Sequence, residues 1–191
     1  MTQAKNDVRV TLEVNVTAPN FELKDIYNRT INLNDYKGKK VFLGFFRHAG
    51  CPFCNLRVHF LSKKMEELKA KNMEMIFFFQ SPQHILLKSI FHQEVSPIPL
   101  ISDPEAIWYQ TYGIENSAVK SAVSHLTTFI QTTIKAKLKG LPVHTMAANE
   151  SITTIPAEFL IDEKSIIRRI HYATGLNDRM SMEHIDAFVN Q

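Results

Sequence analysis

The chain has 191 residues, of which 45% are hydrophobic and 21% are charged, and its formal net charge is +3. This composition is typical of a globular protein with a substantial core, and the length suits a single domain over residues 1–191. So small a net charge gives no indication of a nucleic-acid partner, and we expect none.

The first ten residues, MTQAKNDVRV, lack the apolar core of a secretory signal. No apolar run approaches the length that crosses a membrane, so we expect a cytoplasmic protein without a transmembrane segment. Residues 8–14 alternate between apolar and polar side chains, which predicts a short edge strand.

Continuous apolar runs such as VFLGFFR and MEMIFFFQ predict strands that are buried on both faces of a sheet. The predicted strands lie at residues 41–47, 73–80, 98–103, 157–162 and 165–173. The last two are expected to form a hairpin around Glu163-Lys164.

Apolar residues at helical spacing predict helices between and after these strands. Ser81 and Pro82 are expected to start one of them, and Ser181 to cap the last. The predicted helices lie at residues 55–72, 82–93, 104–113 and 182–190. Because strands alternate with helices before a closing hairpin, the pattern predicts an α/β fold with a mixed sheet flanked by helices, a layout that resembles the thioredoxin-like fold.

A segment at about 115–150 interrupts this pattern before the final hairpin. Its apolar residues recur at helical spacing from Val119 to Leu138, its lysines include Lys135, and it has no acidic residue between 116 and 149. The spacing predicts a helical insertion packed on the domain. A lid, a dimer face and a basic membrane-surface helix stay open as alternatives.

The chain's two cysteines lie together in the stretch FFRHAGCPFC, directly after the predicted strand at 41–47. Cys51 is expected at the N-cap of the following helix, where free N–H groups stabilise a thiolate. Arg47 and His48 add positive potential, and Cys54 is close enough to resolve a mixed disulfide or a sulfenic acid. The motif therefore predicts a redox-active dithiol.

The cysteine pair has three alternative uses. A disulfide that closes so short a loop adds little stability, so a structural staple is disfavoured. Cys51 and Cys54 have the spacing of half a zinc site, with His48 or His59 as further ligands, although the chain has no second CxxC. A pair of inert core thiols is the third alternative.

Four stretches resemble landmarks of the peroxiredoxin branch of the thioredoxin superfamily, the alkyl hydroperoxide reductase/thiol-specific antioxidant group. They occur in the family order, within residues 15–175: APNFELKD with INLNDYKGKKVFLGFF, then CPFC, PLISDPEAIWYQTYGI and IPAEFLIDEKSIIRRIHYA. The resemblance implies a thiol-dependent antioxidant oxidoreductase that reduces peroxides or protein disulfides. It also implies a thioredoxin-type reductant and no metal or organic cofactor, and it leaves a homodimer open.

The chain departs from the peroxiredoxin pattern Pro-x-x-x-Thr-x-x-Cys. When the strands are aligned, Arg47 takes the proline position, Cys51 the threonine position and Cys54 the position of the attacking cysteine. An arginine that typical peroxiredoxins carry is replaced by Pro156. Because thioredoxins have a cis-proline there, Ile155-Pro156 is expected to be cis and to lie beside the CxxC turn, where Ile155 contacts the substrate.

These departures leave two readings of the active centre. Arg47 and His48 are expected to replace the missing threonine and arginine by donating hydrogen bonds to a peroxide oxygen. The helix terminus favours Cys51 as the attacking thiol, whereas the alignment favours Cys54, and we favour Cys51. The alternative function is a non-catalytic thioredoxin-fold binding module that holds zinc through the CxxC pair.

Overall fold

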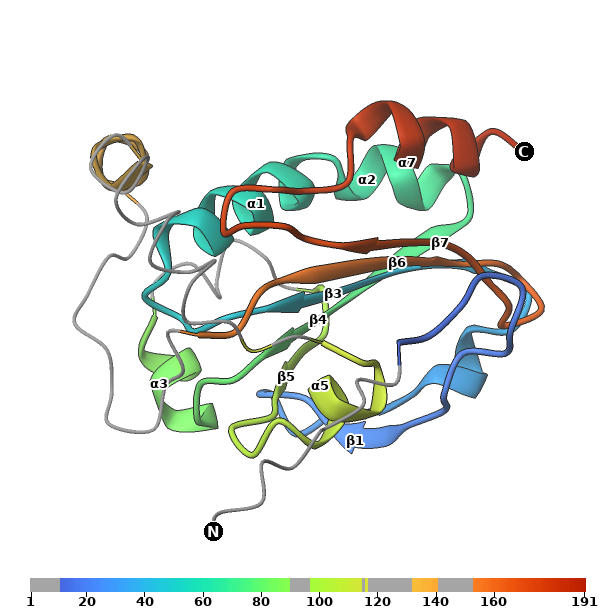
Figure 1. Cartoon of the computed structure of the whole chain (residues 1–191), viewed down its shortest axis with the longest axis horizontal. Coiled ribbons are helices and arrows are strands. Elements are labelled where there is room, and N and C mark those ends of the chain that lie inside the picture. The colour runs from blue at the N-terminus through green and yellow to red at the C-terminus, as the bar shows by residue number, and fades with distance from the viewer. Residues whose placement is uncertain (1–10, 90–96, 115, 117–131, 141–152) are drawn as a thin grey trace, which may run out of the picture.

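The computed structural model describes residues 11–89, 97–114, 116, 132–140 and 153–191 (Figure 1). At its centre is a five-stranded sheet in the order β5-β4-β3-β6-β7. Its strands are β3 (Lys40–Phe46), β4 (Met73–Phe79), β5 (Leu100–Ser102), β6 (Ala157–Ile161) and β7 (Ile167–Tyr172). The first three run parallel, β6 is antiparallel to β3, and β7 is antiparallel to β6. The predicted mixed sheet and its closing hairpin are confirmed.

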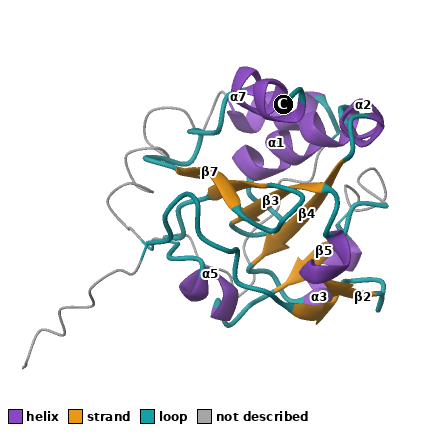
Figure 2. Cartoon of the chain, turned by 90° about the vertical axis from the view of Figure 1, so that its right-hand side faces the viewer, coloured by secondary structure: helices purple, strands orange, loops and turns teal. Residues whose placement is uncertain are grey.

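Helices cover both faces of this sheet (Figures 1 and 2). One face carries α1 (Pro52–Lys63), α2 (Met65–Ala70) and α7 (Met182–Val189). The other carries α5 (Ile107–Thr111), the hairpin of β1 (Glu22–Lys24) with β2 (Thr30–Asn32), and the short helix η1 (Leu33–Tyr36). Helix α3 (Gln83–Lys88) contacts β5. This layered arrangement is the one the sequence predicts.

The central strand β3 is buried along its whole length. Phe42 and Phe46 belong to the hydrophobic cluster under α1, whereas Leu43 and Phe45 belong to the cluster on the opposite face. A Cβ atom at Gly44 would lie 2.9 Å from the Phe46 ring. The glycine therefore leaves room for the neighbouring aromatic rings on the α1 face.

Three predicted helices differ in detail, and one of them, expected over 104–113, is shortened to α5. The helix expected over 55–72 begins earlier and is divided at Lys64, where the amide turns back to Leu61 O at 2.9 Å. Helix α3 has Pro82 rather than Ser81 at its N-cap. The Ser81 hydroxyl is turned elsewhere, because it accepts a hydrogen bond from the Ala49 amide at 2.7 Å. Residues 90–93 of that predicted helix lie outside the described ranges.

The predicted strand over 8–14 is wrong for residues 11–14, which form coil leading into a turn, and residues 8–10 lie outside the described ranges. Asn15 has a φ of 67°, in the left-handed region, and this turn ends any extended run. The chain joins the sheet just afterwards, where the Asn15 amide donates to Ile167 O at 2.7 Å and the Ile167 amide to Val16 O at 2.9 Å.

Part of the predicted insertion is described, and it is helical at 132–138. Residues 115, 117–131 and 141–150 of the insertion lie outside the described ranges. Ser181 caps α7 as predicted, because its hydroxyl accepts a hydrogen bond from the His184 amide at 3.2 Å. Among the residues described, no helix is both long enough and apolar enough to span a membrane.

Candidate active site

The cysteine turn joins the end of β3 to the start of α1. Cys51 is the N-cap of α1 and Pro52 occupies the first turn, as predicted. The Asn55 amide donates the first helical hydrogen bond to Cys51 O at 3.0 Å. Both thiols have no solvent exposure, and they are not joined as a disulfide. The dithiol therefore lies at the N-terminus of α1, in the interior of the protein.

Both backbone groups of Ala49 are bound by side chains, which fixes the turn. The amide donates to Ser81 Oγ at 2.7 Å, and the carbonyl accepts from Asn55 Nδ2 at 2.8 Å. The Cys51 amide then closes the turn by donating to His48 O at 3.0 Å. All of these bonds are buried, so the thiols have a rigid support.

Arg47 contacts both cysteines. Its amide donates to Cys54 Sγ at 3.4 Å, and its guanidinium Nη1 lies 3.8 Å from Cys51 Sγ. Arg47 is wholly buried, so its charge is poorly hydrated and favours a thiolate as its counter-ion. The sequence placed this arginine near the site but did not predict that it would be buried.

His48 is also buried, with 5% of its surface exposed. The backbone carbonyl of His48 accepts the hydrogen bond from the Cys51 amide and so helps to form the cysteine turn. The role expected for its imidazole, donating to a peroxide oxygen, stays a prediction.

A second arginine, which the sequence analysis missed, reaches the site from the loop between β7 and α7. Arg179 Nη2 lies 4.0 Å from Cys54 Sγ, and Nη1 donates to Asp178 O at 2.6 Å. Arg179 is 125 positions away from Cys54 in the sequence. A loop position has no periodicity, so no sequence pattern marked it.

A buried ion pair holds the residue next to Arg179. Arg57 on α1 and Glu158 on β6 are joined at 2.8 Å and 2.9 Å. The Met180 amide donates to Glu158 Oε2 at 2.8 Å, and Met180 O accepts from Arg57 Nη2 at 2.9 Å. This clamp fixes the backbone beside Arg179 and so helps to place its guanidinium.

The environment separates the two thiols in acidity. Burial alone would raise the pKa of Cys51, but the hydrogen bond from the Cys54 side chain, the Arg47 charge, the Cys54 amide and Arg179 together lower it to about 6. The amide acts through its partial charge, since Cys51 Sγ forms no full capping hydrogen bond with the described first turn. Burial, the bond to Cys51 and the charge on Cys51 raise the pKa of Cys54. At neutral pH the pair is therefore a thiolate beside a thiol.

Ile155 and Pro156 precede β6. Ile155 is buried in the same hydrophobic cluster as Cys51 and Cys54, and Pro156 O accepts a hydrogen bond from the Ala173 amide at 3.0 Å. The predicted proximity of Ile155 to the dithiol is consistent with this packing. The cis bond and the contact with substrate stay predictions.

The structure does not bring the ligands of the alternative zinc site together. His48, His59 and the two cysteines are all described, and the described residues contain no group of three or more His, Cys, Asp or Glu side chains placed to hold a metal.

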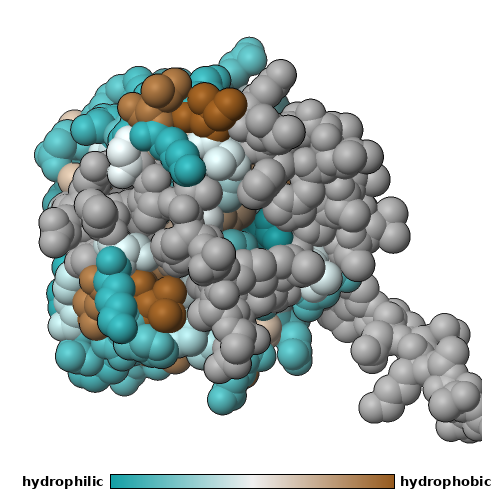
Figure 3. All heavy atoms as spheres, turned by 90° about the vertical axis from the view of Figure 1, so that its left-hand side faces the viewer, coloured by the Kyte–Doolittle hydropathy of each residue, from teal (hydrophilic) through white to brown (hydrophobic). Residues whose placement is uncertain are grey.

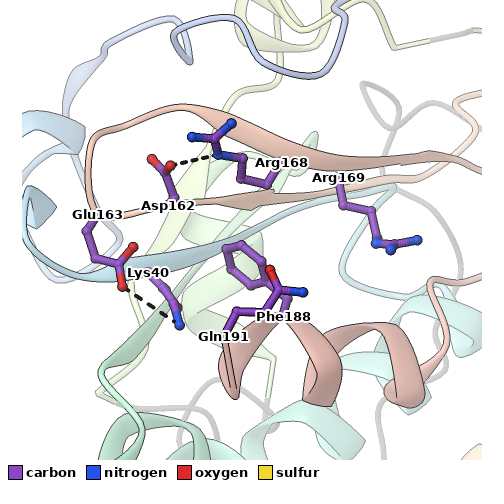
Figure 4. A pocket seen from close by; sticks show the side chains of 7 residues that line it. All are labelled: Lys40, Asp162, Glu163, Arg168, Arg169, Phe188 and Gln191. Atoms are coloured by element: carbon purple, nitrogen blue, oxygen red, sulfur yellow. Dashed lines mark hydrogen bonds and ion pairs between the residues drawn. The ribbon is translucent and has the colours of Figure 1, made fainter.

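A hollow of about 380 Å³ lies at the far end of β3, around Lys40 (Figure 4). Two ion pairs lie in its lining, Arg168–Asp162 at 2.7 Å and Lys40–Glu163 at 3.7 Å, and Arg169 adds a further cationic side chain.

Two relatives are each similar to about half of the chain. Thiol-disulfide oxidoreductase ResA of Bacillus thuringiensis subsp. konkukian (strain 97-27) is 29% identical over 103 residues, which are 54% of this chain and 59% of that protein. Peroxiredoxin Bcp of Escherichia coli (strain K12) is 26% identical over 98 residues, which are 51% of this chain and 62% of that protein. The matched region thus spans about three fifths of these relatives.

Solved structures of similar shape cover more of the chain. Peroxidoxin BcpB from Mycobacterium tuberculosis superposes with a TM-score of 0.63 at 14% identity, over 94% of this chain and 95% of that one. Thiol peroxidase from Chromobacterium violaceum gives a TM-score of 0.64 at 12% identity, over 95% and 88%. These similarities confirm the thioredoxin-like fold of the peroxiredoxins.

The family model described as the AhpC/TSA family matches residues 14–170, a stretch that contains the whole sheet except the end of β7, together with the cysteine turn. This match covers most of the chain. This chain belongs to the AhpC/TSA family.

Proposed function

We propose that this chain is a thiol-dependent antioxidant oxidoreductase that cycles Cys51 and Cys54 between a dithiol and a disulfide, and so reduces peroxides or protein disulfides. The observation that carries the proposal is the pair of unlike thiols. The lowered pKa of Cys51, about 6, supplies a nucleophilic thiolate at neutral pH, and the raised pKa of Cys54 keeps the second thiol protonated beside it.

With a peroxide, the Cys51 thiolate attacks the terminal oxygen and the O–O bond breaks. The alkoxide or hydroxide leaves and takes up a proton, and Cys51 becomes a sulfenic acid. Cys54 then attacks the sulfenic sulfur, which releases water and forms the disulfide. A thioredoxin-type dithiol restores both thiols and becomes a disulfide itself. Arg47 and Arg179, at 3.8 Å and 4.0 Å from the sulfurs, stabilise the charge that develops on the leaving oxygen.

The burial of the site favours a peroxide over a protein disulfide. Both sulfurs have no solvent exposure, and a protein disulfide has to bring its own sulfur into line with the attacked bond. A small hydroperoxide needs a much smaller opening. The two curated relatives carry names of both kinds, one a thiol-disulfide oxidoreductase and the other a peroxiredoxin.

The test is peroxide consumption by the wild type, Cys51→Ser and Cys54→Ser, with thioredoxin, thioredoxin reductase and NADPH supplied. Reduction of insulin disulfides is measured in parallel. We expect consumption by the wild type, loss in Cys51→Ser, and in Cys54→Ser a single turnover that leaves a sulfenic acid detectable by mass spectrometry. Wild-type protein that reduces neither substrate would contradict the proposal.

A further inference from the structure

A hollow of about 260 Å³ lies beside the first turns of α1. It is lined by residues from α1, from the helix at 132–138 and from the loop before α7: Phe53, Leu56, Arg57, Thr132, Lys135, Asn177 and Arg179. Figure 1 shows the helix at 132–138 on the side of the molecule where α1 begins. Part of the insertion is therefore a wall of a hollow next to the dithiol.

Arg179 connects this hollow with the thiols. It lines the hollow, and its Nη2 lies 4.0 Å from Cys54 Sγ. Its Nε is buried and has no hydrogen-bond partner among the described residues, so the described protein groups do not satisfy this guanidinium fully. A molecule held in the hollow would have one end within reach of the arginine that borders the redox pair.

The lining has a definite chemistry. Phe53 and Leu56 supply apolar surface, and no carboxylate lies among the lining residues. Arg57 is neutralised by Glu158, so Lys135 and Arg179 set the charge of the hollow. Figure 3, which views the molecule from the side where α1 begins, shows separate apolar patches bordered by hydrophilic groups among the described residues in view. Such a lining suits a small amphiphilic anion rather than a broad apolar partner.

We infer that this hollow binds the organic part of a carboxylate-bearing hydroperoxide, with the carboxylate on Lys135 and the hydroperoxide directed past Arg179 to Cys51. The inference rests on the proposed function and assigns it a substrate class. The insertion then acts as a specificity element. The redox step is unchanged: the O–O bond breaks, Cys51 becomes a sulfenic acid and the carboxylated alcohol leaves.

The experiment uses two probes that differ in one carboxylate: cumene hydroperoxide and 4-(2-hydroperoxypropan-2-yl)benzoate. The ratio of their kcat/KM values is measured for the full chain, Lys135→Gln and Lys137→Gln. Lys137 is the matched control, because it is exposed on the same helix but does not line the hollow. We expect the wild type to prefer the carboxylated probe, and Lys135→Gln to reduce that preference about three- to fivefold, as for a solvent-accessible charge pair. Lys137→Gln should keep the wild-type ratio.

A binding measurement separates the site from the redox reaction. 4-Isopropylbenzoate has the carboxylate and ring but no peroxide, and its affinity is measured by calorimetry for the same three proteins. Weaker binding in Lys135→Gln than in Lys137→Gln supports the site, even if neither hydroperoxide is consumed, in which case only the proposed function fails. Equal ratios and equal affinities in the two variants would overturn the inference, while consumption of hydrogen peroxide would leave the proposed function standing.

Discussion

Arg57 and Glu158 form a two-pronged ion pair beneath the active-site helix, although 101 positions separate them in the sequence. Their side chains are 8% and 1% exposed. Burying two charges costs free energy, and the pair recovers part of it by bonding both backbone groups of Met180. The pair thus ties α1, β6 and the loop of Arg179 into one unit.

Glu158→Gln should lower the free energy of unfolding by about 3–5 kcal/mol, because Arg57 would be left buried without its counter-charge. The control is Glu74→Gln, which breaks the Lys39–Glu74 pair at the surface and should cost about 1 kcal/mol or less. Guanidinium chloride unfolding of the reduced proteins measures both. Equal losses in the two variants would show that the buried ion pair contributes no more to the free energy of unfolding than the surface pair does.

The acidity of Cys51 should depend on the donor at position 54. Cys54→Ala removes the side-chain hydrogen bond that lowers the pKa of Cys51, so that pKa should rise from about 6. Cys54→Ser keeps a donor, and the pKa should stay lower than in the alanine variant. Iodoacetamide reaction rates of Cys51 as a function of pH give both values. A pKa that is the same in both variants would exclude the hydrogen bond as a cause.

The stability of the reduced protein should fall as the pH decreases from about 8.5 to about 6. The pKa of Cys51 is lowered on folding, to about 6. The thiolate therefore adds stability that is fully present above the unfolded-state value, about 8.5, and is lost as the pH falls through the folded value. Cys51→Ser should lack this part of the pH dependence. Urea unfolding at several pH values compares the two proteins, and parallel curves would refute the linkage.

Arg47 and Arg179 should lower the pKa of Cys51 by unequal amounts. Arg47 lies at Cys51 itself and lowers the pKa of Cys51 more than Arg179 does, after the hydrogen bond from Cys54. Arg47→Met should therefore raise that pKa more than Arg179→Met. We expect Arg47→Met to lose on the order of 100-fold in kcat/KM for hydrogen peroxide.

Arg47→Lys is the control for the arginine at the dithiol, because it keeps the charge and should recover part of the rate. A wild-type rate in Arg47→Met would remove this residue from the mechanism. Circular dichroism of each variant verifies that the fold is retained.

The sequence predicted the elements whose signal is continuous or repeated. The apolar runs at 41–47 and 73–80 correspond to β3 and β4, because a strand buried on both faces gives a continuous run of apolar residues in the sequence. The alternation at 8–14 was misleading, since nothing in it revealed the left-handed turn at Asn15.

At the site, the sequence predicted contacts between residues that are close together in the chain. The cysteines and Arg47 are neighbours in the chain, so their proximity followed from the motif. Arg179 could not be predicted, because its position depends on how a distant loop folds back. Glu158 did leave a signal: a lone carboxylate within the apolar run AEFLI requires a cationic partner. The sequence does not say that this partner is Arg57.

The order of strands in the sheet has a consequence for synthesis of the chain. Strand β3 can pair with β4 soon after both have been synthesised. Its other neighbour, β6, is synthesised only after the long segment between them, and only then can Val41 pair with Ile161. A nascent chain that has emerged only as far as the cysteine turn lacks the β6–β7 hairpin and Arg179. The growing chain therefore carries the cysteines and Arg47 before it has Arg179 and the strands that complete the buried site, and the full active centre forms only when the sheet closes.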